Sequence, residues 1–175
     1  KAHSNPYQHS PEQFGCVVCH RGQGLATTIE DAHGYRENWN FPILKGEYVQ
    51  ASCGQCHQDQ ELVKDAPLLL KGKELFDQYE CLGCHGLRGK GGKDAPDLTT
   101  AGDKKKSELD FGKYDKTRLT QADWEFMHMK NPKVFNQGSE MPDLGLSDED
   151  ARALAIYILS LSKKKVTENL LYVKK

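Results

Sequence analysis

Apolar residues recur with a helical period only in the second half of the 175-residue chain. A closing helix over about 148–162 is predicted by apolar residues at i, i+3, i+4, i+7 and i+8, namely Ala151, Leu154, Ala155, Ile158 and Leu159. Another helix is expected over about 67–79, with Asp65 as its cap and Pro67 as its first helical residue. The pattern therefore predicts that the second half is mainly α.

Capping signals mark further helix starts in the same half. Thr120 and Asp123 have the spacing of a capping box, which predicts a helix over about 121–130 that ends before Pro132. The same spacing of a serine and an aspartate recurs just before the closing helix. The first 66 residues show no sustained helical or strand period, so little regular secondary structure is expected there.

These differences divide the chain near the sequence "DAPLLLKG". We expect a first module over 1–66, a helical domain over 67–163 and a basic and apolar tail over 164–175. The tail contains "NLLYV", which lies beyond the last predicted helix and packs either on its own domain or on another subunit.

The composition leaves little apolar side chain for a protein core. Hydrophobic residues make up 37% of the chain, and the mean hydropathy is -0.72. The formal net charge of -1 argues against nucleic-acid binding, and no apolar run is long enough to span a bilayer. The chain opens without Met, which fits either a processed exported protein or a shortened chain.

All six cysteines belong to Cys-x-x-Cys pairs that are followed directly by His. The motifs are "CVVCH" at 16–20, "CGQCH" at 53–57 and "CLGCH" at 81–85. This pattern is typical of c-type haem attachment, in which two thiols bind the haem covalently and the His is the proximal iron ligand. It predicts three covalently bound haem c groups on Cys16, Cys19, Cys53, Cys56, Cys81 and Cys84, with His20, His57 and His85 as ligands. Zinc sites and disulfides are the alternatives, although they do not explain the three histidines.

The motifs make the chain resemble a multihaem c-type cytochrome. The order of helix, "CLGCH", middle helix, methionine loop and closing helix over 67–163 resembles a class I cytochrome c domain. This resemblance implies that Met141 is the distal ligand of the third haem and that the Pro96 carbonyl accepts a hydrogen bond from His85. It also implies that a small residue packs on an aromatic one between the first and last helices, with Gly72 and Tyr157 as one pair and Phe76 as another candidate.

The first module resembles bis-histidine multihaem cytochromes, which implies two more histidine ligands. We expect these to be His9 and His33, with His33 favoured for the first haem. His3 and His128 remain alternatives. On the helix over 121–130, Met129 falls on the apolar arc and is predicted to be a core residue. Met127 lies at its flank, and His128 lies on the opposite side.

Enough donors are present to saturate all three irons, which favours electron transfer over catalysis. The alternative is a haem enzyme, such as a peroxidase or sulfur-compound oxidase, with one open iron site. The expected partners are redox proteins or other subunits of an electron-transfer complex, in the bacterial periplasm or another extracytoplasmic compartment. Lysine runs such as "DKKK" at 103–106 are either solvated or part of a docking surface for acidic partners.

Overall fold

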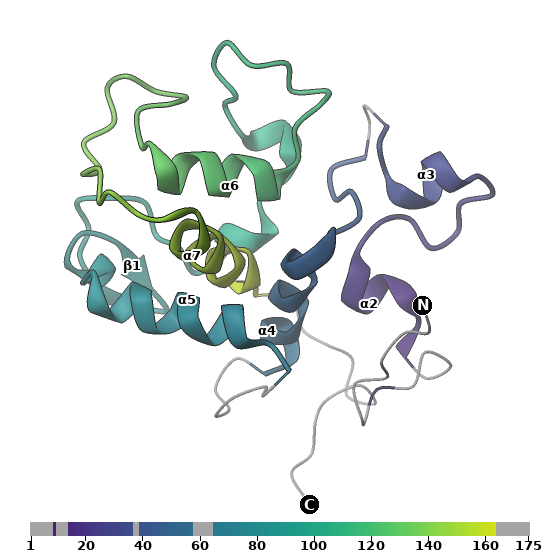
Figure 1. Ribbon diagram of the computed structural model, residues 1–175, viewed down its shortest axis with the longest axis horizontal. Helices are drawn as coiled ribbons and strands as arrows, with labels where there is room; N and C mark the ends of the chain where they lie inside the picture. Colours follow the sequence, from purple (N-terminus) through teal and green to yellow (C-terminus); the bar gives the residue numbers. More distant parts are fainter. Residues whose placement is uncertain (1–8, 10–13, 37–38, 58–64, 164–175) are drawn as a thin grey trace, which may run out of the picture.

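The computed structural model describes residues 9, 14–36, 39–57 and 65–163 (Figure 1). The α-helices are α2 (Cys16–His20), α3 (Ile29–His33), α4 (Cys53–Cys56), α5 (Pro67–Gln78), α6 (Gln121–Lys130) and α7 (Asp148–Ser160). The 3₁₀ helices are η1 (Gly46–Ser52), η2 (Cys81–Gly83), η3 (Ala101–Asp103) and η4 (Lys106–Glu108). Strands β1 (Gly86–Leu87) and β2 (Lys90–Gly91) form a short antiparallel ladder.

The prediction of a mainly α fold is confirmed, and the three long helices lie within two residues of their predicted bounds. None of the helices in the described ranges is long and apolar enough to cross a membrane. His3 and the tail over 164–175 lie outside the described residues. The division into modules at residue 66 stays a prediction.

Helices α5 and α7 lie side by side (Figure 1), and Gly72 of α5 is at their contact. A Cβ atom on Gly72 would overlap the carbonyl of Ala153 and come within 2.8 Å of the Tyr157 Cβ. One turn further along α5, the ring of Phe76 packs on Tyr157 with the centroids 5.2 Å apart. Both candidate contacts of the sequence analysis are therefore present, and they let the two helices approach closely.

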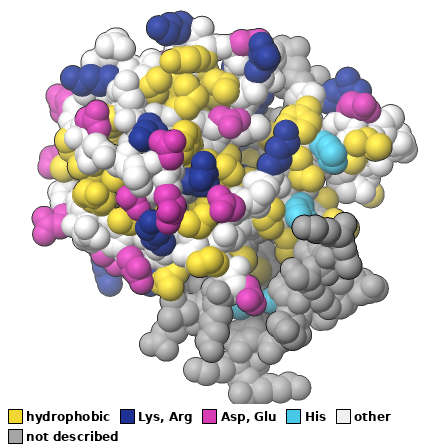
Figure 2. All heavy atoms as spheres, viewed as in Figure 1, with side chains coloured by type: hydrophobic (Ala, Val, Ile, Leu, Met, Phe, Trp, Pro, Cys, Tyr) yellow, Lys and Arg dark blue, Asp and Glu magenta, His cyan; other side chains and the backbone are white. Residues whose placement is uncertain are grey.

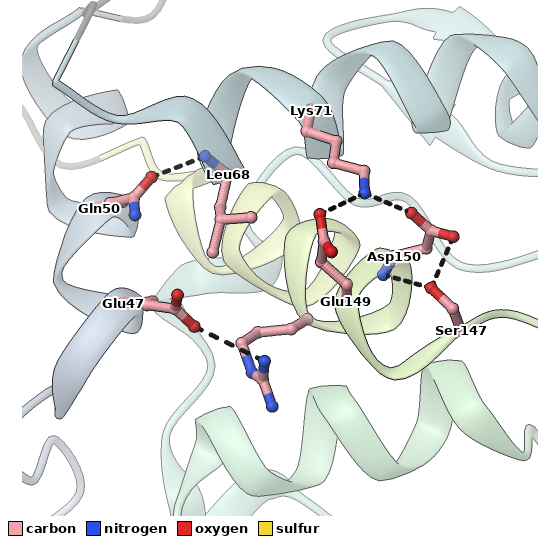
Figure 3. Close-up of polar contacts among 8 residues, drawn as sticks. Glu47, Gln50, Leu68, Lys71, Ser147, Glu149 and Asp150 are labelled. Carbon is pink, nitrogen blue, oxygen red and sulfur yellow. Dashed lines mark hydrogen bonds and ion pairs between the residues drawn. The ribbon is translucent and has the colours of Figure 1, made fainter.

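The capping predictions were correct for α6 and wrong for α5. Thr120 and Asp123 form the predicted capping box of α6. At α5, however, the N-cap is Ala66, because Pro67 is the first helical residue and Asp65 lies one position too early. Gln50 of η1 supplies the cap instead, and its Oε1 accepts a hydrogen bond from the Leu68 N–H at 2.8 Å (Figure 3). The same oxygen accepts a second hydrogen bond from the Leu69 N–H at 3.3 Å.

Further polar contacts tie η1, α5 and α7 together. Lys71 of α5 forms ion pairs with Glu149 and Asp150 at the start of α7, at 2.6 and 2.8 Å (Figure 3). Arg152 lies 3.6 Å from Glu47 of η1. The start of α7 is thereby connected to both halves of the chain.

The N-terminal region, the described residues of 14–57, packs against one side of the helical C-terminal region, residues 65–163 (Figure 1). Ala51 of η1 is fully buried in a cluster with Ala122, Ile156 and Leu159. A Cβ on Gly54 of α4 would come within 2.6 Å of the Ser160 side chain, so α4 lies directly on α7. The N-terminal region therefore uses α7 as its packing support.

Candidate functional site

The third Cys-x-x-Cys-His motif occupies a tight turn that begins where α5 ends. Glu80 has a left-handed backbone conformation with φ 52° directly before η2. The backbone N–H of His85 then donates to the Cys81 carbonyl at 2.9 Å. Cys81 is half-buried and Cys84 is exposed. Two thiols and an imidazole thus come from one compact turn, which fits covalent haem attachment.

The imidazole of His85 is oriented by a backbone carbonyl. Its Nδ1 lies 2.8 Å from the carbonyl oxygen of Pro96. Because a carbonyl only accepts, Nδ1 donates its proton there and the lone pair is left on Nε2. The predicted contact between His85 and Pro96 is confirmed, and it gives His85 the tautomer that can bind iron through Nε2.

Met141 lies in a structured loop between α6 and α7. Side chains of Asn131, Asn136 and Asp143 accept hydrogen bonds from backbone N–H groups two residues ahead, at 2.9 to 3.0 Å. At the end of the loop, Lys130 donates to the carbonyl of Leu146 at 2.6 Å. The half-buried Met141 is therefore held by local turns rather than by a helix, and its role as iron ligand stays a prediction.

The side chains of α6 sort largely as the helical pattern predicts. Met129 packs against the core. On the other side, the ring of His128 stacks on Trp124, with centroids 4.9 Å apart, and Trp124 stacks in turn on Phe135 at 5.4 Å. Burial, and next the charges of His85 and Lys104, lower the pKa of His128 to about 4. His128 is therefore a neutral, stacked imidazole of the C-terminal region.

Glu125 is a buried acid that the sequence analysis did not identify. It is 3% exposed, on the side of α6 that faces the protein interior. Burial raises the pKa of its carboxyl to about 8, and the charge of Lys104 opposes this shift. A glutamate between aromatic and apolar residues on a helix looks solvent-facing in sequence, so only the tertiary packing reveals it.

The charges of the first and second motifs act on each other. Burial, and next the neighbouring Cys19, raise the pKa of the Cys53 thiol to about 11. Burial, and next the charge of Cys19, also raise the pKa of the Cys56 thiol. The attachment residues of α2 and α4 are therefore neighbours across the module.

His9 lies beside the histidine of the second motif. The ring centroids of His9 and His57 are 6.0 Å apart and the ring planes are at 82°. The two rings are therefore edge-to-face neighbours, and the role of His9 as an iron ligand stays a prediction.

His33 is connected to the first motif through the segment that follows it. The backbone N–H of Ile43 donates to the His33 carbonyl at 2.8 Å, and that of Leu44 donates to the His20 carbonyl at 2.8 Å. Gly34 ends α3 in a left-handed conformation with φ 72°. The exposed His33 thus lies at the end of α3 next to the first motif, which fits a ligand for that site.

Arg21 is a second residue that the sequence analysis missed. It directly follows the first motif, and its guanidinium reaches into the C-terminal region. Nη1 donates to Gln121 Oε1 at 3.0 Å, and Nη2 donates to the carbonyls of Leu159 and Gly102 at 3.2 and 3.4 Å. Burial lowers the pKa of Arg21, and the charge of Asp103 opposes this shift.

The donor set fits covalently attached haem. No disulfide joins any of the six cysteines, all of which lie among the described residues. Each thiol pair is followed by an imidazole, and the His85 tautomer leaves Nε2 available. Attachment needs both thiols of a pair and the adjacent His, and each motif supplies these groups.

Comparisons with known proteins agree with this chemistry. A sequence model of the family described as cytochrome c matches residues 69–162. Cytochrome c oxidase subunit 2 of Alkalihalophilus pseudofirmus is 29% identical to this chain over 92 residues, which cover 52% of the chain and 25% of that relative. No solved structure gives a significant match. Because the family match spans more than half of the chain, and the thiols and oriented His85 lie within it, the chain belongs to the cytochrome c family.

Proposed function

We propose that the chain is a trihaem cytochrome that relays electrons between redox partners, from two bis-histidine haems to one histidine–methionine haem. The observation that carries this proposal is the threefold occurrence of a free thiol pair followed by His. When bound, the haems would supply one-electron exchange at iron. The protein side chains attach, orient and shield them.

In the C-terminal region, Cys81 and Cys84 are the proposed attachment residues. His85 is the proximal ligand, because its hydrogen bond to Pro96 fixes the ring and exposes Nε2. Met141 is the distal ligand, in a loop whose turns hold it outside α6 and α7. A thioether favours ferrous iron more than a second imidazole does, so the highest potential is assigned to this site.

In the N-terminal region, His20 and His33 would hold the iron of the first haem, and His57 and His9 that of the second. The parallel backbone bonds from Ile43 and Leu44 support the first pair. The 6.0 Å separation of the His9 and His57 rings supports the second. The attachment residues are Cys16 and Cys19 for the first haem, and Cys53 and Cys56 for the second.

The proposed partners are redox proteins or other subunits of an electron-transfer complex. The cytochrome c family match implies redox partners, and the relative named as an oxidase subunit supports a respiratory context. We propose a periplasmic or otherwise extracytoplasmic location, because covalent haem attachment of this type takes place there, with association to a membrane through partner subunits.

Haem counting combined with low-temperature EPR tests the proposal. A haemochrome assay on the purified full-length protein is expected to give three haems per chain. The EPR spectrum is expected to contain two bis-histidine low-spin signals and one histidine–methionine signal. Fewer than three haems would contradict the trihaem proposal, and a high-spin signal from a five-coordinate iron would instead indicate the haem-enzyme alternative.

A further inference from the structure

Arg21 joins the first motif to three elements of the C-terminal region. Its backbone directly follows His20, and its guanidinium Nη1 donates to Gln121 Oε1 of α6 at 3.0 Å. Nη2 donates to the carbonyl oxygens of Leu159 in α7 at 3.2 Å and of Gly102 in η3 at 3.4 Å. One side chain of the N-terminal region is therefore bonded to α6, η3 and α7 at once.

The bond to Leu159 gives α7 a cap that its own sequence does not supply. Leu159 lies in the last turn of α7, where carbonyl groups have no partner within the helix, and this turn contains no basic residue. A cation at the carboxyl end of a helix is stabilising, because it faces the negative end of the helix dipole. Arg21 thus provides both a donor and a positive charge at the end of α7, from a distant part of the chain.

The backbone of Arg21 has a conformation that favours glycine. Its φ of 60° with a ψ of -142° lies in a region that residues with a Cβ rarely adopt. Such a conformation persists where the surrounding contacts hold it in place. The three hydrogen bonds of the guanidinium, and its position 5.9 Å from the centroid of the Phe41 ring, offset the cost of this backbone.

The first and second motifs are joined to the C-terminal region in different ways. In the second motif, the backbone of α4 lies on α7, since a Cβ on Gly54 would come within 2.6 Å of the Ser160 side chain. The segment of the first motif reaches the C-terminal region through side chains. Arg21 makes three hydrogen bonds there, and Asn40 accepts one from the Ser107 backbone N–H at 3.1 Å. The position of the first motif therefore rests on contacts that single substitutions remove.

We propose that Arg21 is a clamp that fixes the segment of the first motif, the described residues of 14–44, on the end of α7. The clamp in turn fixes the position of the first haem relative to the other two. Arg21 is a positioning residue, since it acts through the motif that it follows. The part that concerns the haem rests on the proposed trihaem function, whereas the clamp itself does not.

Hydrogen–deuterium exchange of the haem-loaded full-length protein tests the clamp. Arg21→Gly removes the side chain and suits a backbone with φ 60°, so the turn after the first motif still forms. We expect exchange to be faster by about tenfold or more in residues 14–44 and in the last turn of α7, because a hydrogen bond from a charged donor shifts an equilibrium by at least about this factor. Exchange in η1 and α5 is expected to stay unchanged.

Two further variants serve as comparisons. Arg21→Lys keeps the charge and is expected to retain most of the protection at the end of α7. Arg36→Gln is the matched control, because Arg36 lies in the same region, is exposed and pairs with Asp31 at 2.6 Å. It is expected to leave exchange in α7 unchanged.

The positioning role is tested by laser photoreduction of the same proteins, which measures how fast an electron distributes among the haems. This rate is expected to fall in Arg21→Gly and to be largely restored in Arg21→Lys. An unchanged rate in an Arg21→Gly protein that has lost protection in residues 14–44 would overturn the positioning role.

A substitution in α6 leaves Arg21 in place in case Arg21→Gly does not load haem. Gln121→Leu removes one of the three acceptors while keeping the buried position filled, and is expected to give a smaller increase in exchange in residues 14–44. Unchanged exchange there in a correctly loaded Gln121→Leu protein would contradict the clamp.

Two other exchange results would overturn the clamp. One is unchanged exchange in residues 14–44 and in the last turn of α7 in Arg21→Gly, and the other is an equal loss of protection there in Arg36→Gln. A haem count below three in the unsubstituted protein would instead refute the trihaem function, and the exchange results would still decide whether Arg21 is a clamp.

Discussion

The C-terminal and N-terminal regions are stabilised in different ways. In the C-terminal region, α5 and α7 cross in close contact, and Leu154 and Leu159 are at most 2% exposed. In the N-terminal region, Leu25 is 97% exposed and Ile29 is 72% exposed. Figure 2 shows histidine side chains exposed on the N-terminal side of one face, and charges of both signs beside apolar side chains over the helical region.

The C-terminal region therefore has its own protein core, whereas the N-terminal region depends on contacts with groups outside it. The N-terminal segments are linked by single backbone hydrogen bonds such as Gly22 to Phe41 and Gln23 to Ala32. Of their buried residues, Ala51 and Gly54 pack against α7. Covalently held macrocycles would supply the apolar surface that the N-terminal region lacks.

The largest expected effect comes from the crossing of α5 and α7. Gly72→Val places two methyl groups where the Ala153 carbonyl and Tyr157 already lie. We expect a loss of about 4 kcal/mol in the free energy of unfolding, because neither α5 nor α7 can move without exposing the core. Chemical denaturation of the haem-loaded protein measures this loss in the free energy of unfolding.

Lys73→Val is the matched control, since Lys73 is exposed on the same helix. A change below about 0.5 kcal/mol is expected there. If Gly72→Val were equally mild, the helix crossing would not be the main source of stability in the C-terminal region.

Local signals in the sequence predicted the helical region well. The capping box at Thr120 and the proline at position 67 depend on neighbouring residues, so helix starts were correctly placed to within a residue. The contact between His85 and Pro96 came from the family resemblance and was also correct. These features concern residues close together in the chain or fixed by a known fold.

Long-range contacts could not be predicted in the same way. Gln50 rather than Asp65 caps α5, and it comes from a different element. Arg21 binds groups 81 to 138 positions away, so nothing near it in sequence indicates its partners. The burial of Glu125 depends on how α6 packs against the rest of the fold.

The second largest effect is a pH dependence of the free energy of unfolding, which comes from Glu125 in the C-terminal region. The pKa of Glu125 is about 8 in the folded protein and 4.5 ordinarily, so the folded state binds more protons between these values. Stability contributed by the neutral acid is therefore full below pH 4.5 and falls as the pH rises towards 8. Above pH 8, the free energy of unfolding of Glu125→Gln is expected to exceed that of the unsubstituted protein by on the order of 3 kcal/mol.

Unfolding measured at pH 6.5 and above isolates this effect from that of His128. The pKa of His128 is lowered to about 4 from 6.5, so its own contribution is lost only as the pH falls below 6.5. A stability difference between Glu125→Gln and the unsubstituted protein that stays constant from pH 6.5 to 9 would show that Glu125 does not titrate in this range.

The docking of the N-terminal region gives a smaller effect. Ala51 is 0% exposed against Ala122, Ile156 and Leu159. Ala51→Leu overfills this contact, and we expect a loss of about 2 kcal/mol in docking. Limited proteolysis is expected to cleave the N-terminal region first while α5 and α7 stay protected. Simultaneous cleavage of both regions would contradict their separate stabilisation.

The smallest effect is expected at the exposed surface of the N-terminal region. Leu25→Ser changes a side chain that is 97% exposed, so the free energy of unfolding should change by less than about 0.5 kcal/mol. A loss of more than about 1 kcal/mol, measured on the haem-loaded protein by chemical denaturation, would show that this leucine is buried when the haems are bound.

The N-terminal and C-terminal regions are also predicted to differ in the reduction potentials of their iron sites. An EPR-monitored redox titration of the haem-loaded protein, resolving three midpoints, tests this most directly. The account predicts that the histidine–methionine site at His85 and Met141 has the highest midpoint and that both bis-histidine sites of the N-terminal region lie below it. A lowest midpoint at the His85 site would contradict the proposed relay from the N-terminal to the C-terminal region.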